Sequence, residues 1–386
     1  MKSRKKIWLI FISIVVLVSG ITYIYLNVNS WKYSAEEGMM SKKNFLTDKK
    51  AILFFSTTID INPGKSIAFF VDQKGEISYR SMKPLELGSV AVHDDQVLIE
   101  DKENIFILGN KAGKYKRNSQ HTGDQNGYIN KTGSFYTIYN SGYADDGKSY
   151  KSEVYWNIGR QMKSDVIPYY IREKGFYDDT IFTAQTHDAD KSRQFKFKKI
   201  HLGNKMKIEE VAEVSLGKNA SPLSQLMVDD EFIYFLFNGA KGEAVYQLAK
   251  INQKNKVVET FDIKTYRKYK EQAHQAVPFD RIPAYLKNDF IYFADGFGEV
   301  VKINKKNGKI EGSYNLNSKS VNSGLKNLQF EGDSIFLFSM NRGQDGMIEK
   351  YRLQDGKLTE VTPVKDIGKI VNQNSRVHLY DFEIIH

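Results

Sequence analysis

A short polar turn followed by a run of hydrophobic residues recurs along most of this chain of 386 residues. The runs begin near Gln96 (QVLIE), Ser134 (SFYTIY), Thr180 (TIFTA), Phe232 (FIYFLF), Phe290 (FIYFAD) and Ser334 (SIFLFS). The turns before them, rich in Asp, Asn and Gly, lie at residues 93–95, 131–133, 177–179, 229–230, 288–289 and 332–333. Repetition at about 40–50 residues, with several short strands in each unit, is typical of a β-propeller.

Each repeat has a second half made of further strands. Segments that alternate between hydrophobic and polar residues, each divided by a turn, begin at Lys241, Gly298 and Gly346. Half-buried antiparallel strands produce such alternation. We therefore predict an all-β fold, a single propeller of four-stranded blades, with strands A to D from the inside to the outside. Aromatic residues make up 13% of the chain, which suits strands.

The polar pairs before the hydrophobic runs are interpreted as A–B turns, because short Asp and Asn side chains tolerate positive φ. Calcium binding is the alternative use of a row of carboxylates. Each pair lies directly before a strand and lacks the clustered oxygen ligands that calcium needs. The pattern therefore favours turns.

Seven units are counted, and six or eight remain open because the early repeats are degenerate. Their B strands begin near Ile52, Gln96, Ser134, Thr180, Phe232, Phe290 and Ser334. The first unit has no A strand, while the chain ends in an unassigned strand at residues 376–386 (RVHLYDFEIIH). Placing this strand in the first blade removes the sheet edges that an open array would expose. The predicted propeller spans residues 51–386.

The N-terminal residues predict a membrane anchor. Residues 1–6 form a basic leader, and residues 7–26 are mostly apolar and uncharged, which is long enough for one transmembrane helix. The positive-inside bias places the leader in the cytoplasm and the rest outside the cell. A cleaved signal peptide is the alternative, with cleavage near residues 18–20. Residues 27–50 are then expected to form a polar stalk.

Composition narrows the chemistry and the partners. The chain contains no cysteine, which excludes disulfides, cysteine nucleophiles and attachment of a lipid to a cysteine. In an exported chain rich in Lys and Asn, this absence indicates a Gram-positive bacterium. The net charge is +10, but the lysines are dispersed among turns, whereas nucleic-acid binding needs them on one face. We expect a monomeric propeller without a nucleic-acid partner; an anionic wall polymer remains compatible.

One repeat resembles a known group of proteins. The unit at residues 300–310, VVKINKKNGKI, is similar to the repeat of bacterial quinoprotein-like or YVTN-type β-propellers. Quinone-dependent members of that group carry a tryptophan shortly after the Gly-Lys of the turn and a calcium-bearing acidic active site. The matching stretch in this chain is IEGSYNL, without a tryptophan. The resemblance therefore implies a non-catalytic, membrane-anchored propeller.

Propeller topology predicts where a binding site lies. The B–C loops and the D–A connections share one face with the mouth of the central channel, and variable loops on a rigid scaffold often carry recognition. We call this the loop face. The candidate ligand-binding residues in its B–C loops are Tyr143, Asp145, Asp146, His187, Asp188, Asp190, Phe297, Arg342 and Asp345. Each Asp is also compatible with a role as a turn former.

The largest departure from the repeat is the connection at residues 264–285. Thr265 is predicted to cap a short helix that ends near Ala276, before Pro278. Tyr266, Arg267 and Tyr269 lie on it, and Tyr and Arg are enriched in binding hot spots. The alternatives are a partner-binding element and a helix that plugs the channel mouth.

Motifs for catalysis, metals and cofactors are missing from the sequence. It contains no HExxH, GxSxG, P-loop or GxGxxG pattern, and we predict no cofactor and no metal. The favoured function is binding of an envelope protein, a peptide or a cell-wall polymer outside the membrane. The alternative is a hydrolase or lyase for surface glycans, because two carboxylates from different blades can act as acid and base.

Overall fold

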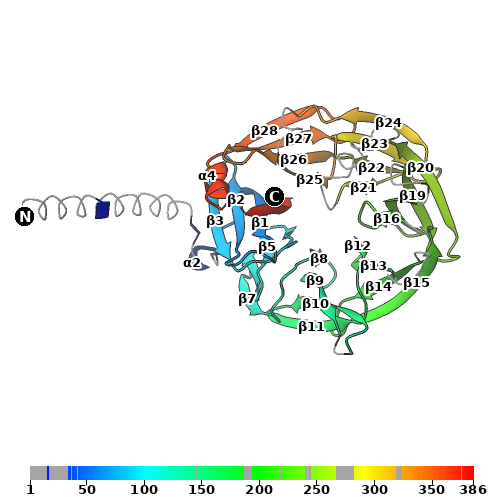
Figure 1. Cartoon of the computed structure of the whole chain (residues 1–386), viewed down its shortest axis with the longest axis horizontal. Helices are drawn as coiled ribbons and strands as arrows, with labels where there is room; N and C mark the ends of the chain where they lie inside the picture. Colours follow the sequence, from blue (N-terminus) through cyan, green and yellow to red (C-terminus); the bar gives the residue numbers. More distant parts are fainter. Residues whose placement is uncertain are drawn as a thin grey trace, which may run out of the picture.

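Seven antiparallel sheets are arranged as blades around a central axis (Figure 1). The computed structural model describes residues 15–16, 34–35, 37–40, 42–144, 146–186, 194–217, 220–239, 241, 245–266, 282–318, 324–374 and 376–386. The predicted all-β propeller with seven blades is confirmed. We number the blades 1 to 7 in the order of their outer strands along the chain.

The first four blades consist of four strands each, ordered below from the axis outwards. Blade 1 contains β29 (Val377–Ile384), β1 (Lys49–Thr57), β2 (Ser66–Asp72) and β3 (Ile77–Met82). Blade 2 contains β4 (Ala91–His93), β5 (Gln96–Glu100), β6 (Asn104–Gly109) and β7 (Gly113–Lys116). Blade 3 contains β8 (Gln125–Ile129), β9 (Ser134–Tyr143), β10 (Tyr150–Ile158) and β11 (Gln161–Ile167). Blade 4 contains β12 (Glu173–Tyr177), β13 (Thr180–Thr186), β14 (Gln194–His201) and β15 (Lys207–Ser215).

The last three blades follow the same plan, although the inner strand of blade 5 is divided into two pieces that both pair with β18. Blade 5 contains β16 (Ser221–Pro222), β17 (Met227–Val228), β18 (Phe232–Asn238), β19 (Val245–Asn252) and β20 (Val258–Thr265). Blade 6 contains β21 (Ala284–Lys287), β22 (Phe290–Ala294), β23 (Glu299–Asn304) and β24 (Ile310–Asn315). Blade 7 contains β25 (Leu325–Glu331), β26 (Ser334–Met340), β27 (Gly346–Arg352) and β28 (Leu358–Val364). The described helices are α2 (Glu37–Met40) and α4 (Ile367–Gln373).

The predicted turns before the second strands are confirmed. Strands β5, β9, β13, β18, β22 and β26 begin at the residues predicted from the sequence. Asp or Asn residues with positive φ angles occur in the turns before three of these strands, at Asp94 (49°), Asp178 (44°), Asp179 (59°) and Asn288 (53°). Asp and Asn adopt this left-handed conformation more readily than other residues with a side chain. These residues therefore act as turn formers.

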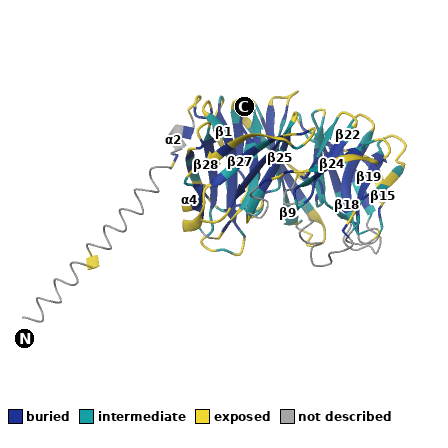
Figure 2. Cartoon of the chain, turned by 90° about the horizontal axis from the view of Figure 1, so that it is seen from above, coloured by how far each residue is buried: buried dark blue, intermediate teal, exposed yellow. Residues whose placement is uncertain are grey.

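The core lies between the blades, because both faces of each sheet are buried. Seven clusters of buried hydrophobic side chains each join one blade to the next. Along β1, Ile52 and Phe54 pack toward blade 2, while Leu53 and Phe55 pack toward blade 7. In the side view, buried residues fill the strands and exposed residues gather in the turns at both faces (Figure 2). Burial on both faces explains why these strands are nearly continuous hydrophobic runs.

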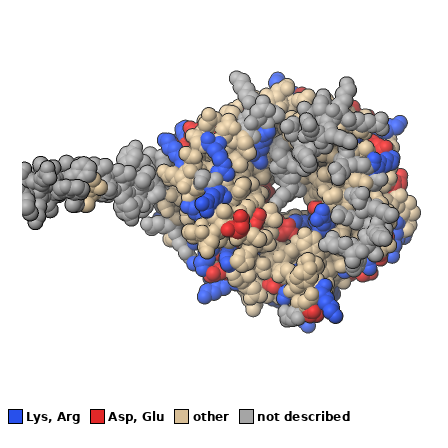
Figure 3. Space-filling view, in the orientation of Figure 1, with Lys and Arg blue, Asp and Glu red and all other residues tan. Residues whose placement is uncertain are grey.

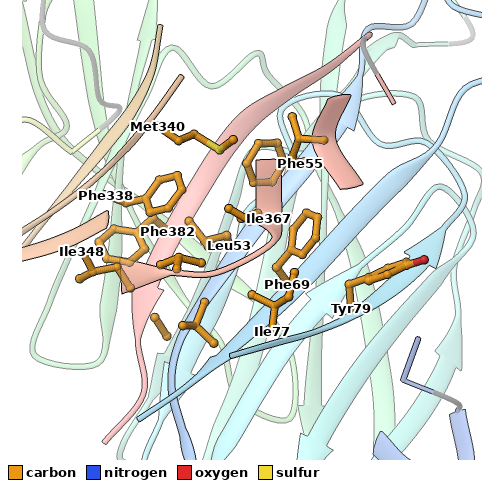
Figure 4. Close-up of a cluster of buried hydrophobic side chains, with 14 of the residues drawn as sticks. Leu53, Phe55, Phe69, Ile77, Tyr79, Phe338, Met340, Ile348, Ile367 and Phe382 are labelled. Carbon is orange, nitrogen blue, oxygen red and sulfur yellow. The ribbon is translucent and has the colours of Figure 1, made fainter. Parts of the chain in front are cut away.

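The C-terminal strand closes the ring. β29 is the inner strand of blade 1 and pairs antiparallel with β1, so the predicted role of residues 376–386 is confirmed. Helix α4 precedes β29, and Ile367 packs beside Phe382, Phe338 and Leu53 in the cluster that joins blade 7 to blade 1 (Figure 4). The first and the last blade of the ring are thus joined by one shared hydrophobic core.

The segment before β1 belongs to the propeller. Met40, Phe45 and Leu46 are buried in the cluster between blades 1 and 2, and Ser34 forms a parallel bridge with Tyr79. The polar stalk predicted at residues 27–50 is therefore wrong for the described part of this range. The hydrophobic residues of this segment are too few for the sequence pattern to distinguish a packed segment from a loop.

The predicted membrane anchor at residues 7–26 lies outside the described residues except for positions 15 and 16. Within the described part of the chain, none of the helices has both the length and the apolar character required to cross a bilayer.

Candidate functional site

Half of the predicted ligand-binding residues can be placed in the structure. Those in the described ranges are Tyr143, Asp146, Tyr266, Phe297, Arg342 and Asp345. Those outside them are Asp145, His187, Asp188, Asp190, Arg267 and Tyr269. Most of the helix predicted in the 264–285 connection also lies outside the described residues. Thr265, its predicted cap, is the last residue of β20.

Tyr143 belongs to a group of three tyrosines on the loop face of blade 3, of which Tyr143 and Tyr150 are exposed and Tyr170 is half-buried. Tyr143 ends β9 and Tyr150 begins β10; their rings stack with centroids 4.1 Å apart, and the Tyr150 hydroxyl donates to the Tyr143 hydroxyl at 2.8 Å. Tyr170, in the connection to blade 4, meets the Tyr150 ring edge to face at 5.7 Å. Tyr143 is 57% exposed. We call these three residues the tyrosine ridge.

Asp146 shapes the loop that brings the two stacked tyrosines together. Its Oδ1 accepts the backbone N–H groups of Lys148 and Ser149, both at 2.9 Å, and its Oδ2 accepts the Ser149 hydroxyl at 2.7 Å. These hydrogen bonds lower the pKa of Asp146 to about 2. Asp146 therefore acts as a turn former that supports the tyrosine ridge.

Tyr266 is not a surface contact, which corrects its predicted role. Its side chain is buried, and its hydroxyl donates to Asp295 Oδ2 at 2.7 Å. Burial, and next the charge of Asp295, raise the Tyr266 pKa well above its usual value. Lys264 Nζ also donates to Asp295 at 3.0 Å. Phe297 packs against the same cluster, and its backbone N–H donates to Asp295 Oδ1.

Tyr266→Phe is expected to destabilise the fold, because the buried Asp295 carboxylate loses a donor. The expected cost is about 1–3 kcal/mol in the free energy of unfolding, measured by urea denaturation. Tyr143→Phe is the matched control, and its exposed hydroxyl should leave the unfolding midpoint unchanged. Equal effects of the two substitutions would contradict the structural role of Tyr266.

Arg342 and Asp345 hold the connection that leads to the closing strand. Arg342 Nη2 donates to the carbonyl oxygen of Val377 at 2.8 Å, at the start of β29. Asp345 Oδ1 accepts the backbone N–H of Asp366 at 2.8 Å, directly before α4. Both residues are exposed, but these contacts give them a structural part in the closure of the ring.

The second part of the candidate site, after the tyrosine ridge, is a polar channel that runs through the centre of the ring. Its cavity measures about 350 Å³ and is lined by the inner strands and the connections before them. The charged residues in its wall are Asp124, Arg172, Glu173, Lys174, Asp381 and Glu383. Figure 3 shows the hollow at the centre of the ring, with acidic and basic atoms at its rim.

Three of the channel carboxylates connect neighbouring blades. Asp124 of the connection into blade 3 forms an ion pair with Lys174 of blade 4. Asp381 Oδ2 accepts the backbone N–H of Val90 at 2.7 Å, and Glu383 accepts the side-chain amide of Gln329. These contacts fix the inner strands relative to each other.

Arg172 differs from the other charged groups of the channel. Its Nη2 lies 3.4 Å from Ser221 Oγ, and its Nε is buried without a hydrogen-bond partner. No ion pair joins it to any residue within the described ranges. Because an unsatisfied buried donor is costly, Arg172 is the charged wall residue whose hydrogen bonding a ligand would improve.

Sequence reasoning missed the channel residues, although a signal for some of them is present. In the segment DFEI of β29, Asp381 and Glu383 alternate with Phe382 and Ile384, so the polar pair shares one face of the strand. Such alternation in an inner strand indicates a polar channel.

Metal ligands do not gather in the described part of the chain: no group there contains three or more suitably placed His, Asp or Glu residues.

Comparison with known proteins identifies the family. The model of the YycP β-propeller domain matches residues 44–385. The uncharacterized protein YycP of Bacillus subtilis (strain 168) is 34% identical over 390 residues, which cover 98% of this chain and 99% of the relative. The chain belongs to the YycP β-propeller family. The matched range of this family begins within the segment that packs on blades 1 and 2, which agrees with its place in the fold.

Solved structures share only the fold with this YycP-family propeller. A mutant of the apocarotenoid oxygenase of Synechocystis matches with a TM-score of 0.50 at 8% identity and covers 87% of this chain and 92% of its own. Apo AztD from Citrobacter koseri matches with a TM-score of 0.41 at 11% identity, over 87% and 98% of the two chains. The quinoprotein-like resemblance of the repeat remains a likeness of blade pattern.

Proposed function

We propose that this YycP-family protein is a membrane-anchored binding module outside the cytoplasm. Its loop face recognises an envelope protein, a peptide or a cell-wall polymer. The observation that carries the proposal is the tyrosine ridge, an exposed aromatic surface on the loop face. Family membership supplies the fold, and a fold alone does not define a function.

The ridge has the properties of a recognition surface. Tyr143 and Tyr150 lie at the ends of paired strands, and the stacking of their rings and their mutual hydrogen bond hold both side chains in place. A preorganised aromatic side chain loses little conformational entropy when it binds. Tyrosine offers an apolar ring together with a polar hydroxyl, which suits both protein and sugar surfaces.

The proposed membrane anchor at residues 7–26 rests on the sequence. The basic leader and the apolar run that follows it are the sequence features that support this anchor.

The alternative function, a hydrolase or lyase that acts on surface glycans, draws on the channel carboxylates. An acid and base pair requires two carboxyl groups that are free to exchange protons with a substrate. Asp124, Asp381 and Glu383 each already accept a donor from a neighbouring blade. Their structural engagement favours binding over hydrolysis.

Tyr143→Ala combined with Tyr150→Ala is expected to weaken partner capture by tenfold or more, about the value of one hot-spot residue. Binding to the cell wall is measured by co-sedimentation of the full-length protein, in nanodiscs, with purified cell-wall sacculi. Binding to protein partners is measured by treating intact protoplasts with a membrane-impermeant cross-linker. Leu358→Ala, an exposed substitution on the outer strand of blade 7, is the control and should have no effect. Absence of sedimentation and of cross-linking for the unaltered protein would contradict the proposal.

A further inference from the structure

The basic residues of the channel wall all lie on one side of it. Arg172 and Lys174 belong to β12 of blade 4 and the connection before it, beside Glu173 and Asp124, whereas the opposite side carries Asp381 and Glu383 of β29 in blade 1. Blades 1 and 4 lie across the ring from each other. In Figure 3, basic atoms lie on one side of the central hollow and acidic atoms lie on the other. A ligand that spans the channel therefore meets basic groups at one of its ends only.

The positive side has an unused hydrogen-bonding capacity. Lys174 is paired with Asp124, but among the described residues the Arg172 guanidinium has only the 3.4 Å contact with Ser221, and its buried Nε has no partner there. A guanidinium binds a carboxylate through two parallel hydrogen bonds, and Arg suits this geometry better than Lys. A carboxylate is the complementary ligand group.

The negative side offers oriented acceptors. Asp381 accepts the backbone N–H of Val90 and Glu383 accepts the side-chain amide of Gln329, and these contacts hold both carboxylates in the channel wall. An ammonium group or an amide N–H matches this wall.

We propose that the channel binds a small zwitterion of the amino-acid or short-peptide class. Its carboxylate binds Arg172, and its ammonium group lies toward Asp381 and Glu383. The cavity of about 350 Å³ is within the range of small-molecule sites, about 300–1,000 Å³. Ordered water is the competing occupant of a polar cavity. This inference rests on the channel and is independent of the tyrosine ridge.

The first test compares four probes on the full-length protein in nanodiscs by isothermal titration calorimetry. The probes are L-alanyl-L-alanine, its N-acetyl form, its C-terminal amide and the form blocked at both ends. The free dipeptide is expected to bind with a dissociation constant of about 1 mM or tighter. Each single block should weaken binding by about tenfold or more, because it removes one charge-assisted contact. No binding of the free dipeptide, or equal binding of all four, overturns the proposal and leaves a water-filled channel.

The second test assigns the carboxylate contact to Arg172. Arg172→Gln should weaken the free dipeptide by about tenfold but leave the affinity for the C-terminal amide unchanged. Arg160→Gln, an exposed charge-matched substitution in the β10–β11 turn, is the control, and the Tyr143→Ala, Tyr150→Ala protein should bind the dipeptide normally. Equal loss for both probes in Arg172→Gln contradicts the assignment. Thermal unfolding confirms that each variant is folded, and the four-probe comparison needs no variant.

Discussion

Removal of residues 376–386 is expected to abolish the cooperative unfolding of the propeller. β29 pairs with β1 over seven residue pairs, from Ala51–Ile384 to Thr57–Val377, and Val377 and Phe382 are buried in the cluster that joins blade 7 to blade 1. Without β29, the edge of β1 and the buried side chains of this cluster become exposed to solvent. A single buried Phe→Ala substitution costs about 3–5 kcal/mol. Loss of the whole strand is therefore expected to exceed the total stability of a typical domain, about 5–15 kcal/mol.

The truncation is measured by thermal unfolding with circular dichroism and by size-exclusion chromatography. Phe382→Ala should lower the midpoint but keep a single transition, and His378→Ala, exposed on the same strand, should change stability by no more than about 0.5 kcal/mol. A peptide of residues 376–386, added to the truncated protein, should restore the transition. A truncated protein that melts like the full chain would show that closure depends on other contacts.

Arg117→Met is expected to cost about 3–5 kcal/mol, because it leaves a buried carboxylate without its counter-charge. Glu100 in blade 2 and Arg117 after it have completely buried side chains, joined by a 2.5 Å contact from Arg117 Nη1 to Glu100 Oε2. Thr137 of blade 3 also donates to Glu100 at 2.9 Å, and the guanidinium lies over the Tyr139 ring at 4.8 Å. The pair thus connects blades 2 and 3.

The cost of Arg117→Met should depend on pH. Burial raises the pKa of Glu100 above its usual value, against the lowering effects of Arg117 and Thr137. A carboxyl with a raised pKa in the folded state stabilises the fold below its unfolded pKa, and this contribution is lost as the pH rises through the folded pKa. Removal of Arg117 raises the pKa further. The stability difference from the unaltered protein should therefore be largest at neutral pH and shrink as the pH falls toward the usual carboxyl range.

Urea denaturation over a pH series measures this effect, and a second substitution isolates its cause. Glu100→Gln in the Arg117→Met background removes the buried charge, so stability should partly recover at neutral pH. The pH dependence of the stability difference from the unaltered protein should then flatten or change sign. Arg352→Met, in the exposed ion pair with Asp355, is the control and should leave the unfolding midpoint unchanged. An Arg117→Met cost that is the same at every pH would contradict an unpaired Glu100 charge.

The tyrosine ridge shows how far the sequence reaches toward the candidate site. The position of Tyr143 in a variable loop predicts a contact residue, but nothing in the sequence predicts its partners Tyr150 and Tyr170. The stacking of Tyr143 on Tyr150 depends on the register of β9 and β10, and the contact with Tyr170 depends on the approach of the next blade. The local pattern assigns Tyr266 to an exposed helix, and only the structure shows its hydroxyl on the buried Asp295.

The sequence by itself determined the blades, their turns and the closing strand. Alternation with a period of two and the positive φ that Asp94 and Asn288 accept are local properties, so they can be predicted from neighbouring residues. Only the tertiary structure decided which polar groups meet. When the ring closes, it brings together blades that are distant in the chain. This packing decides which groups lie beside Arg172, Asp381 and the buried pair of Glu100 and Arg117. Burial and the convergence of charges are properties of that packing, and no local pattern contains them.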